Sequence, residues 1–374
     1  MAKSLKLSTA DRTRSIPRVG VAAAAAGVLA VALAGAVLWL ALSADTTMDR
    51  LRAEADRTSL TARVILPVPI GGAGAEAPPP AELSLNTAMA QPVAGNRPPP
   101  GTRETPALPP APAPGLVEQT ADGALPKIGA DGRLPRQVYA RPFDAADTRP
   151  RIAVVVTDMG HADAATNTAI RRLPPPVTLA FTPYARDLDA WLKAARTVGH
   201  ETLMMLPMEP DSYPRDAPGP HTLLTSLGPA NNRGRLEWVL GRGVGYVGVI
   251  TEMGSRFTLS EEALSPVLTI LRNRGLLLLD NSAAANSRAG TVGNRVGLPV
   301  VANDRRIDAV VDRDTIDLRL QELEEIARQR GVAVGLAGPL PLTFERLAAW
   351  FPTLERKGIV LVPVSAVIER PTAG

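Results

Sequence analysis

From residue 151 onward, short apolar runs alternate with longer stretches in which apolar residues recur three and four positions apart. The runs predict buried strands and the longer stretches predict helices. Gly199, Gly275, Gly331 and Gly358 each close a helical stretch just before an apolar run, where a left-handed residue ends a helix. The predicted strands are 152–157, 177–182, 202–206, 245–250, 275–280, 298–302, 332–336 and 359–364. The predicted helices are 163–172, 187–197, 231–242, 260–273, 314–330 and 343–356.

This repeated order of strand and helix predicts an α/β fold, a distorted (β/α) barrel with a parallel sheet, over residues 151–370. In such a barrel the functional groups lie at the C-terminal ends of the strands. The polar residues that follow each apolar run are therefore the candidate site, and the carboxylates among them are expected to share one hollow. These candidates are Asp158, His161, Glu209, Glu252, Arg256 and Asp280.

The N-terminal third has a different pattern. Residues 19–42 are uncharged and rich in Ala, Val and Leu, which predicts a transmembrane helix able to cross about 30 Å of hydrocarbon. Basic residues dominate 1–18 and acidic residues follow the run, so 1–18 is expected in the cytoplasm and the C-terminal domain in the periplasm. The alternative is a signal peptide cleaved near Ala44, although the run is longer than a signal peptide requires.

Two further segments precede the barrel. Residues 43–122 are predicted to be a juxtamembrane stretch and a disordered linker, because the part from 67 is dominated by Pro, Ala and Gly and cannot bury a core. A ligand for a proline-binding module is the alternative to a spacer. Residues 123–150 regain apolar and aromatic side chains and are interpreted as a strap packed on the barrel.

Composition narrows the function classes. The net charge is +4 over 374 residues without a long Lys/Arg run, so nucleic acid is not an expected partner. There is no cysteine, which excludes disulfides and thiolate metal sites. The three histidines, His161, His200 and His221, leave few imidazoles for a zinc site.

Several phrases of this chain are similar, in the same order, to those of a known family. Residues 151–370 resemble the divergent polysaccharide deacetylase family, a distant branch of the NodB-like deacetylases. The lead-in at 125–143 resembles that of the family as well. The phrases are Val-Val-Val-Thr-Asp (154–158), Val-Thr-Leu-Ala-Phe-Thr-Pro-Tyr-Ala (177–185), Gly-His-Glu (199–201), Leu-Pro-Met-Glu-Pro (206–210), Gly-Pro-His-Thr-Leu-Leu-Thr (219–225), Met-Gly-Ser-Arg-Phe-Thr (253–258), Leu-Leu-Asp (278–280) and Leu-Val-Pro-Val-Ser (361–365).

The resemblance implies a barrel that acts on envelope carbohydrate through a metal held by aspartate and histidines. This chain departs from that pattern: Thr157 stands at the first aspartate position, Met205 and Leu336 at two histidine positions, and Glu252 at a third. Asp158 is the only retained ligand position. A zinc site built on histidines is therefore not expected, whereas an oxygen-ligated divalent ion stays open.

Three functions remain open from the sequence. The first is a glycan-binding protein that has lost or altered its deacetylase activity, and the second is an active carboxylate-based deacetylase with Asp158 and Glu252 as acid and base. The third is an envelope scaffold with a vestigial pocket. Asp280, Arg256, His161 and Glu209 are the substrate-binding candidates, with Arg256 expected to pair with Glu252. The expected partner is an envelope polysaccharide or peptidoglycan.

Overall fold

The computed structural model describes residues 107–121 and 123–368 of the chain. The expected cytoplasmic tail, the expected membrane span at 19–42 and most of the expected linker lie outside these residues. Within the described ranges, no helix combines the length and the apolar character needed to cross a bilayer.

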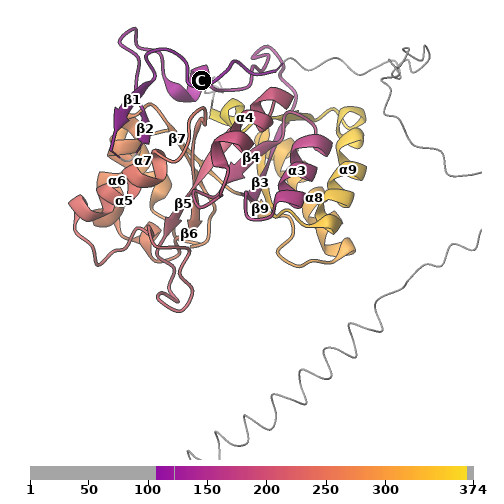
Figure 1. Cartoon of the computed structure of the whole chain (residues 1–374). Helices are drawn as coiled ribbons and strands as arrows, with labels where there is room; N and C mark the ends of the chain where they lie inside the picture. Colours follow the sequence, from indigo (N-terminus) through magenta and orange to yellow (C-terminus); the bar gives the residue numbers. More distant parts are fainter. Residues whose placement is uncertain (1–106, 122, 369–374) are drawn as a thin grey trace, which may run out of the picture. The chain divides into compact units, whose positions relative to one another are not determined.

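The centre of the domain is a nine-stranded sheet in which every recorded pairing is parallel. Its order is β8-β7-β6-β5-β4-β3-β10-β9, and β11 lies beside the start of β3. Each predicted strand is present, so the predicted α/β fold is confirmed, and the expected distorted barrel takes the form of a curled parallel sheet (Figure 1). The strands are β3 (Arg151–Met159), β4 (Thr178–Phe181), β5 (Thr202–Met208), β6 (Gly248–Met253), β7 (Leu277–Asp280), β8 (Val300–Ala302), β9 (Arg305–Arg306), β10 (Val332–Ala337) and β11 (Val360–Val362).

The two ends of this sheet belong to one short segment of chain. β8 pairs with β7, while β9, which begins three residues later, pairs with β10. Between them the Asn303 N–H donates to the Asp280 carbonyl, and the Asp304 N–H donates to the Val334 carbonyl. The segment 300–306 therefore crosses from one edge of the sheet to the other, and the sheet curls round on itself.

Successive side chains of the strands point to opposite faces and form two cores. Val155, Leu203, Met205 and Leu279 belong to the cluster inside the curl. Their neighbours, such as Val156 and Leu278, belong to the larger cluster between the sheet and the helices. Burial on both faces is why these strands read as nearly continuous apolar runs.

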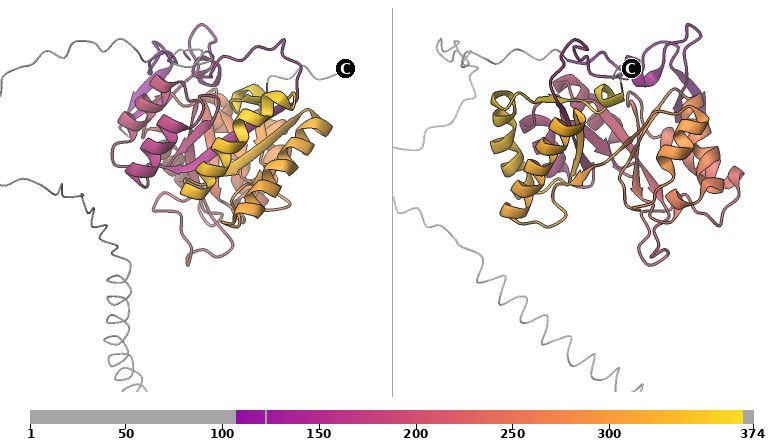
Figure 2. Two further views of the ribbon diagram at one scale, coloured as in Figure 1. Left: turned by 90° about the vertical axis from the view of Figure 1, so that its right-hand side faces the viewer. Right: turned by 180° about the vertical axis from the view of Figure 1, so that it is seen from behind.

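The helices lie outside the curled sheet. α3, α8 and α9 gather on one side of it and α5, α6 and α7 on the other (Figures 1 and 2). Ser260 begins α6 as predicted, since its Oγ accepts the Ala263 N–H at 3.2 Å. The helices that cover the sheet are α3 (Asp163–Arg172), α4 (Leu188–Val198), α5 (Pro229–Leu240), α6 (Glu261–Asn273), α7 (Ala289–Val296), α8 (Arg313–Arg330) and α9 (Pro341–Arg356), and the short elements at the domain's ends are β1 (Val117–Thr120), β2 (Gly123–Pro126), α2 (Pro135–Val138), η1 (Phe257–Leu259) and α10 (Ser365–Ile368).

The strap begins earlier than the sequence suggested. Leu108 and Leu116 are already buried and β1 lies at 117–120, within the stretch expected to be linker. The Arg196 guanidinium donates to the carbonyls of Pro109, Tyr139 and Gly245 at 2.7–3.0 Å, which ties the strap to α4 and to the chain entering β6.

The strap and the C-terminal segment meet at the N-terminal ends of the strands. Glu201, just before β5, is fully buried and accepts the N–H groups of Arg141 and Ser365 and the Ser365 hydroxyl at 2.5–3.1 Å. Burial raises the pKa of Glu201, and these hydrogen bonds oppose that effect. This end of the barrel is covered, and the loop that follows β5 projects from the opposite end (Figure 1).

Candidate functional site

Three strands end in unusual backbone. Asp158, Met253 and Ser282, at or just after the ends of β3, β6 and β7, have φ angles of 63°, 56° and 57°. Side-chain-bearing residues seldom adopt this left-handed region. They are the described non-glycine residues with positive φ, and all lie at the strand ends where the fold places a site.

Asp158 is held by its neighbours on both sides. The Thr157 hydroxyl donates to Asp158 Oδ2 at 2.7 Å, and the Asp158 N–H points across the curl to Met205 Sδ at 3.3 Å. The side chain is half-buried. The left-handed turn therefore fixes a carboxylate above the apolar interior of the barrel.

Glu252, at the end of β6, faces the same region. Its Oε2 atom is buried and has no hydrogen-bond partner among the described residues. Burial, and secondly the charge of Asp158, raises the pKa of Glu252 to about 8. Glu252 is therefore mainly protonated at neutral pH, close enough to Asp158 to respond to its charge.

An aromatic cluster lies beside this pair. Burial raises the pKa of Tyr184, and the nearby Glu252 carboxyl raises it further. The Tyr184 hydroxyl accepts the backbone N–H of His221 at 3.1 Å. The rings of His221 and Trp238 stack with their centroids 3.5 Å apart. Loop 219–225 is thus fastened to α5, next to Glu252.

Glu209 and Arg256 form a brace between loops. Glu209 Oε2 accepts the N–H and hydroxyl of Thr225 at 2.6 and 2.7 Å, and Glu209 Oε1 lies 3.4 Å from Arg256 Nη1. The expected Arg256–Glu252 pair is therefore corrected, because the guanidinium lies beside Glu209 instead. A role of either side chain in substrate binding stays a prediction.

Asp280 and His161 do not join the carboxylate pair. Asp280 is 4% exposed, its Oδ1 accepts the Ser282 N–H at 3.0 Å, and the strand's alternation places it on the outer face with Leu278. His161 is exposed. Of the three expected carboxylates, Asp158 lies close enough to Glu252 to raise its pKa, and a role of Asp280 or His161 in substrate binding stays a prediction.

A charged pair that sequence reasoning missed, Arg306 and Asp308, lies at the same strand ends. Arg306 Nη1 donates to Thr157 Oγ1 at 3.4 Å, and Arg306 Nε donates to Asp308 Oδ1 at 2.9 Å. The Asp308 side chain is fully buried and accepts the Gly338 N–H and the Thr343 hydroxyl at 2.6 and 3.0 Å. The sequence signal for this pair was the phrase Arg-Arg-Ile-Asp (305–308), which begins three residues after the end of the predicted strand 298–302.

The donor set does not fit a zinc ion held by imidazoles. Met205 and Leu336, at two expected histidine positions, are 3% and 2% exposed and belong to the inner apolar cluster. The Met205 sulfur already faces the Asp158 N–H. Across the described ranges, no three His, Asp or Glu side chains come together as a metal site would need.

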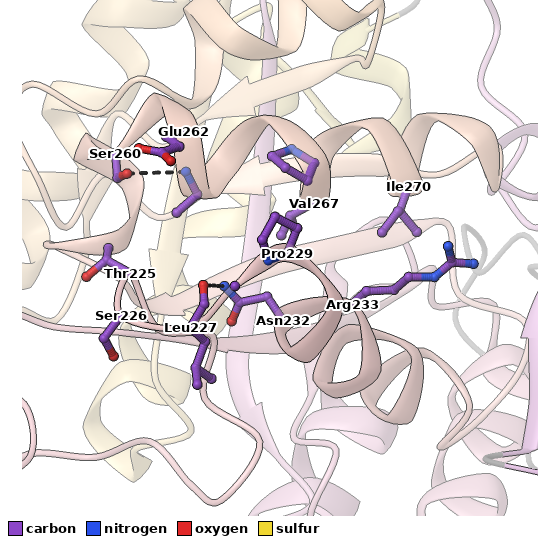
Figure 3. A pocket seen from close by; sticks show the side chains of 13 residues that line it. Thr225, Ser226, Leu227, Pro229, Asn232, Arg233, Ser260, Glu262, Val267 and Ile270 are labelled. Carbon is purple, nitrogen blue, oxygen red and sulfur yellow. Dashed lines mark hydrogen bonds between the residues drawn. The ribbon is translucent and has the colours of Figure 1, made fainter.

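A separate cavity of about 280 Å³ lies between α5 and α6 (Figure 3). Asn232 lies at its wall. The Asn232 Oδ1 atom accepts the Leu224 N–H, and its Nδ2 atom donates to the carbonyls of Leu224 and Leu227. No candidate site residue lines this cavity, so it does not belong to the Asp158–Glu252 site.

Comparisons with known proteins show which family and fold this chain is similar to. The sequence model of the divergent polysaccharide deacetylase family matches residues 154–368. An uncharacterised Escherichia coli K12 protein, YibQ, is 24% identical over 226 residues, which cover 59% of this chain and 68% of YibQ. An uncharacterised Haemophilus influenzae Rd protein is 27% identical over 201 residues, or 53% of this chain and 70% of that protein. The crystal structure of the uncharacterised protein ATU2773 from Agrobacterium tumefaciens C58 superimposes with a TM-score of 0.64 at 37% identity, covering 66% of this chain and all of that one.

Proposed function

This chain belongs to the divergent polysaccharide deacetylase family, and on that premise we propose that it binds an envelope glycan at the C-terminal ends of β3 and β6. The observation that carries the proposal is the buried, unpartnered Oε2 atom of Glu252 beside Asp158. A buried polar atom without a partner costs about 1–3 kcal/mol, and a ligand hydroxyl at this position would remove that cost.

The two carboxyl groups suit sugar hydroxyls, which both donate and accept hydrogen bonds. At neutral pH a protonated Glu252 can donate to a hydroxyl oxygen, while a side-chain oxygen of Asp158 accepts from a neighbouring hydroxyl. Thr157 holds Asp158 in place, so the acceptor is preorganised.

Glycan binding is tested on the full-length chain by calorimetric titration with envelope oligosaccharides. We expect Asp158→Asn and Glu252→Gln each to weaken binding about tenfold, which corresponds to about 1.4 kcal/mol. Glu325→Gln, at an exposed position on α8, should change the affinity less than twofold. Equal affinities for all four proteins would refute a site at these residues.

A second candidate, deacetylation by the same pair, is favoured by the raised pKa of Glu252 next to Asp158. Two carboxyls in different protonation states can divide the base and acid roles. Asp158 would take a proton from a water molecule while the oxygen of that water bonds to the acyl carbon. Glu252 would give its proton to the departing nitrogen or oxygen of the sugar. The products are acetate and the free amine or hydroxyl.

Acetate release from acetylated oligosaccharides separates binding from turnover. An enzyme of this kind would lose activity in Asp158→Asn and Glu252→Gln, and the wild-type rate would fall above about pH 8 as Glu252 ionises. Binding without any acetate release, at any pH, would leave the first function standing alone.

Membrane anchoring in the inner membrane and a periplasmic domain are part of the proposal. They rest on the apolar run at 19–42 and the basic residues before it. Deleting residues 19–42 should move the protein from the membrane fraction to the soluble fraction. An unchanged distribution would refute the anchor.

A further inference from the structure

We propose that Arg306, fixed by Asp308, forms an anion subsite beside Asp158 and Glu252 that selects glycans bearing a carboxylate. The inference rests on the proposed glycan-binding function and names the class of glycan. The family resemblance implies a metal cation at these strand ends. In this chain the guanidinium of Arg306 supplies positive charge there instead.

Arg306 is held in one orientation. Its Nε–H is bound to Asp308, whose carboxylate is itself anchored by Gly338 and Thr343. Gly338 leaves room for the guanidinium, because a Cβ atom at that position would lie 3.2 Å from Arg306 Nη2. Ligand binding therefore causes little further loss of conformational entropy in the Arg306 side chain.

Arg306 also has donors to spare. A guanidinium carries five N–H groups. Within the described part of the chain, one is used on Asp308 and one on Thr157, which leaves three. The side chain is 42% exposed, so a ligand can reach it. A planar carboxylate matches two neighbouring N–H donors of a guanidinium.

The subsite is one side chain away from the carboxylate pair. Arg306 donates to the same Thr157 hydroxyl that donates to Asp158. A sugar that bonds Asp158 or Glu252 through its hydroxyls thus brings a ring substituent within reach of Arg306. Asp158 and Asp308 partly offset the positive charge, which favours a singly charged carboxylate over a doubly charged phosphate.

Two ligand pairs test the inference on the full-length chain. Trigalacturonate and its fully esterified methyl ester differ in the charge and the ester methyl groups of the uronates. N-acetylglucosaminyl-N-acetylmuramic acid and N,N′-diacetylchitobiose differ by the lactyl ether with its carboxylate. We expect the wild type to bind the acid of at least one pair about fivefold more tightly or better, and the responding pair identifies the source of the carboxylate.

Arg305 provides a matched control. It is the adjacent residue of β9, is 40% exposed and pairs with Glu322 instead of the strand-end groups. Arg306→Gln should abolish the preference for the acid while leaving the neutral ligand bound within twofold. Arg305→Gln, which removes the same charge, should keep the preference, and Arg306→Lys should keep part of it because the charge stays but the paired donors are lost.

The possible outcomes distinguish the anion subsite from the proposed glycan binding on which it rests. If the wild type binds neutral and acidic ligands equally well and Glu252→Gln binds both weakly, the subsite is refuted and glycan binding is retained. Equal loss of both ligands in Arg306→Gln would assign Arg306 a structural role and also refute the subsite. Absence of binding to all four ligands, together with failed binding of other envelope oligosaccharides, would overturn both proposals.

Discussion

At the residue scale, Glu252 couples the site to stability. Its pKa is about 8 in the folded protein, above the ordinary glutamate value of 4.5, so folding favours the protonated form. The stabilisation is complete below the unfolded pKa and is lost as pH rises through the folded pKa. The wild type should therefore lose on the order of 3–4 kcal/mol between pH 4.5 and pH 8 relative to Glu252→Gln.

Urea unfolding of both proteins across this pH range measures that difference, since all other titrating groups are shared. Asp158→Asn should show a smaller pH dependence, because it removes the repulsion that contributes to the shift. A difference between wild type and Glu252→Gln that stays constant with pH would contradict the assignment.

The residues of the site show what a sequence can and cannot place. Asp158 and Glu252 follow apolar runs, and the rule that parallel strands end at a common edge predicts that they lie near each other. In the structure the charge of Asp158 contributes to the raised pKa of Glu252. Asp280 obeys the same rule, yet the alternation of β7 turns it to the outer face. Arg306 and Tyr184 depend on which loops meet in space, and no local pattern carries that information.

At the element scale, close contact between β6 and β7 depends on a glycine. A Cβ atom at Gly248 would lie 2.2 Å from the Leu277 carbonyl oxygen, whereas one at Gly234 in α5 would meet open space. Gly248→Ala should destabilise the protein by about 2–4 kcal/mol. Gly234→Ala should stabilise it by about 0.5–1 kcal/mol through helix propensity.

Chemical denaturation of the two variants against the wild type measures both effects. The pair is informative because the substitution is identical and only the surroundings differ. A Gly248→Ala variant as stable as the wild type would mean that β6 and β7 do not approach as closely as described.

Most elements were predictable because both faces of the sheet are buried and the helices are amphipathic. β9 was missed because it has two residues, both arginines, and its pairing with β10 comes from the curl of the sheet. α7 was missed because Gly290 and Gly293, which have low helix propensity, lie within it. The errors therefore fall where tertiary pairing overrides local preference.

At the scale of the whole molecule, Glu201 joins the two ends of the described domain. Glu201→Ala would leave Arg141 and both Ser365 donors without their acceptor, at a cost of about 3–5 kcal/mol. The melting temperature should fall by roughly 6–20 °C for a domain of this size. Glu118→Ala, at an exposed ion pair, should change it by less than about 3 °C.

Calorimetry gives the melting temperatures, and limited proteolysis shows where the chain loosens. Cleavage in Glu201→Ala should rise both in the strap and near α10, because one side chain holds both. Increased cleavage in only one of these segments would show that the other is secured independently.

The covered end of the barrel also has a mechanical consequence. The described chain enters through the strap at Leu108 and Pro109, both bound to Arg196, on the pole opposite Asp158 and Glu252. A tensile load applied between a captured polymer and the upstream chain would run through the whole domain. The three carbonyls gripped by Arg196 would then act as the latch that resists it.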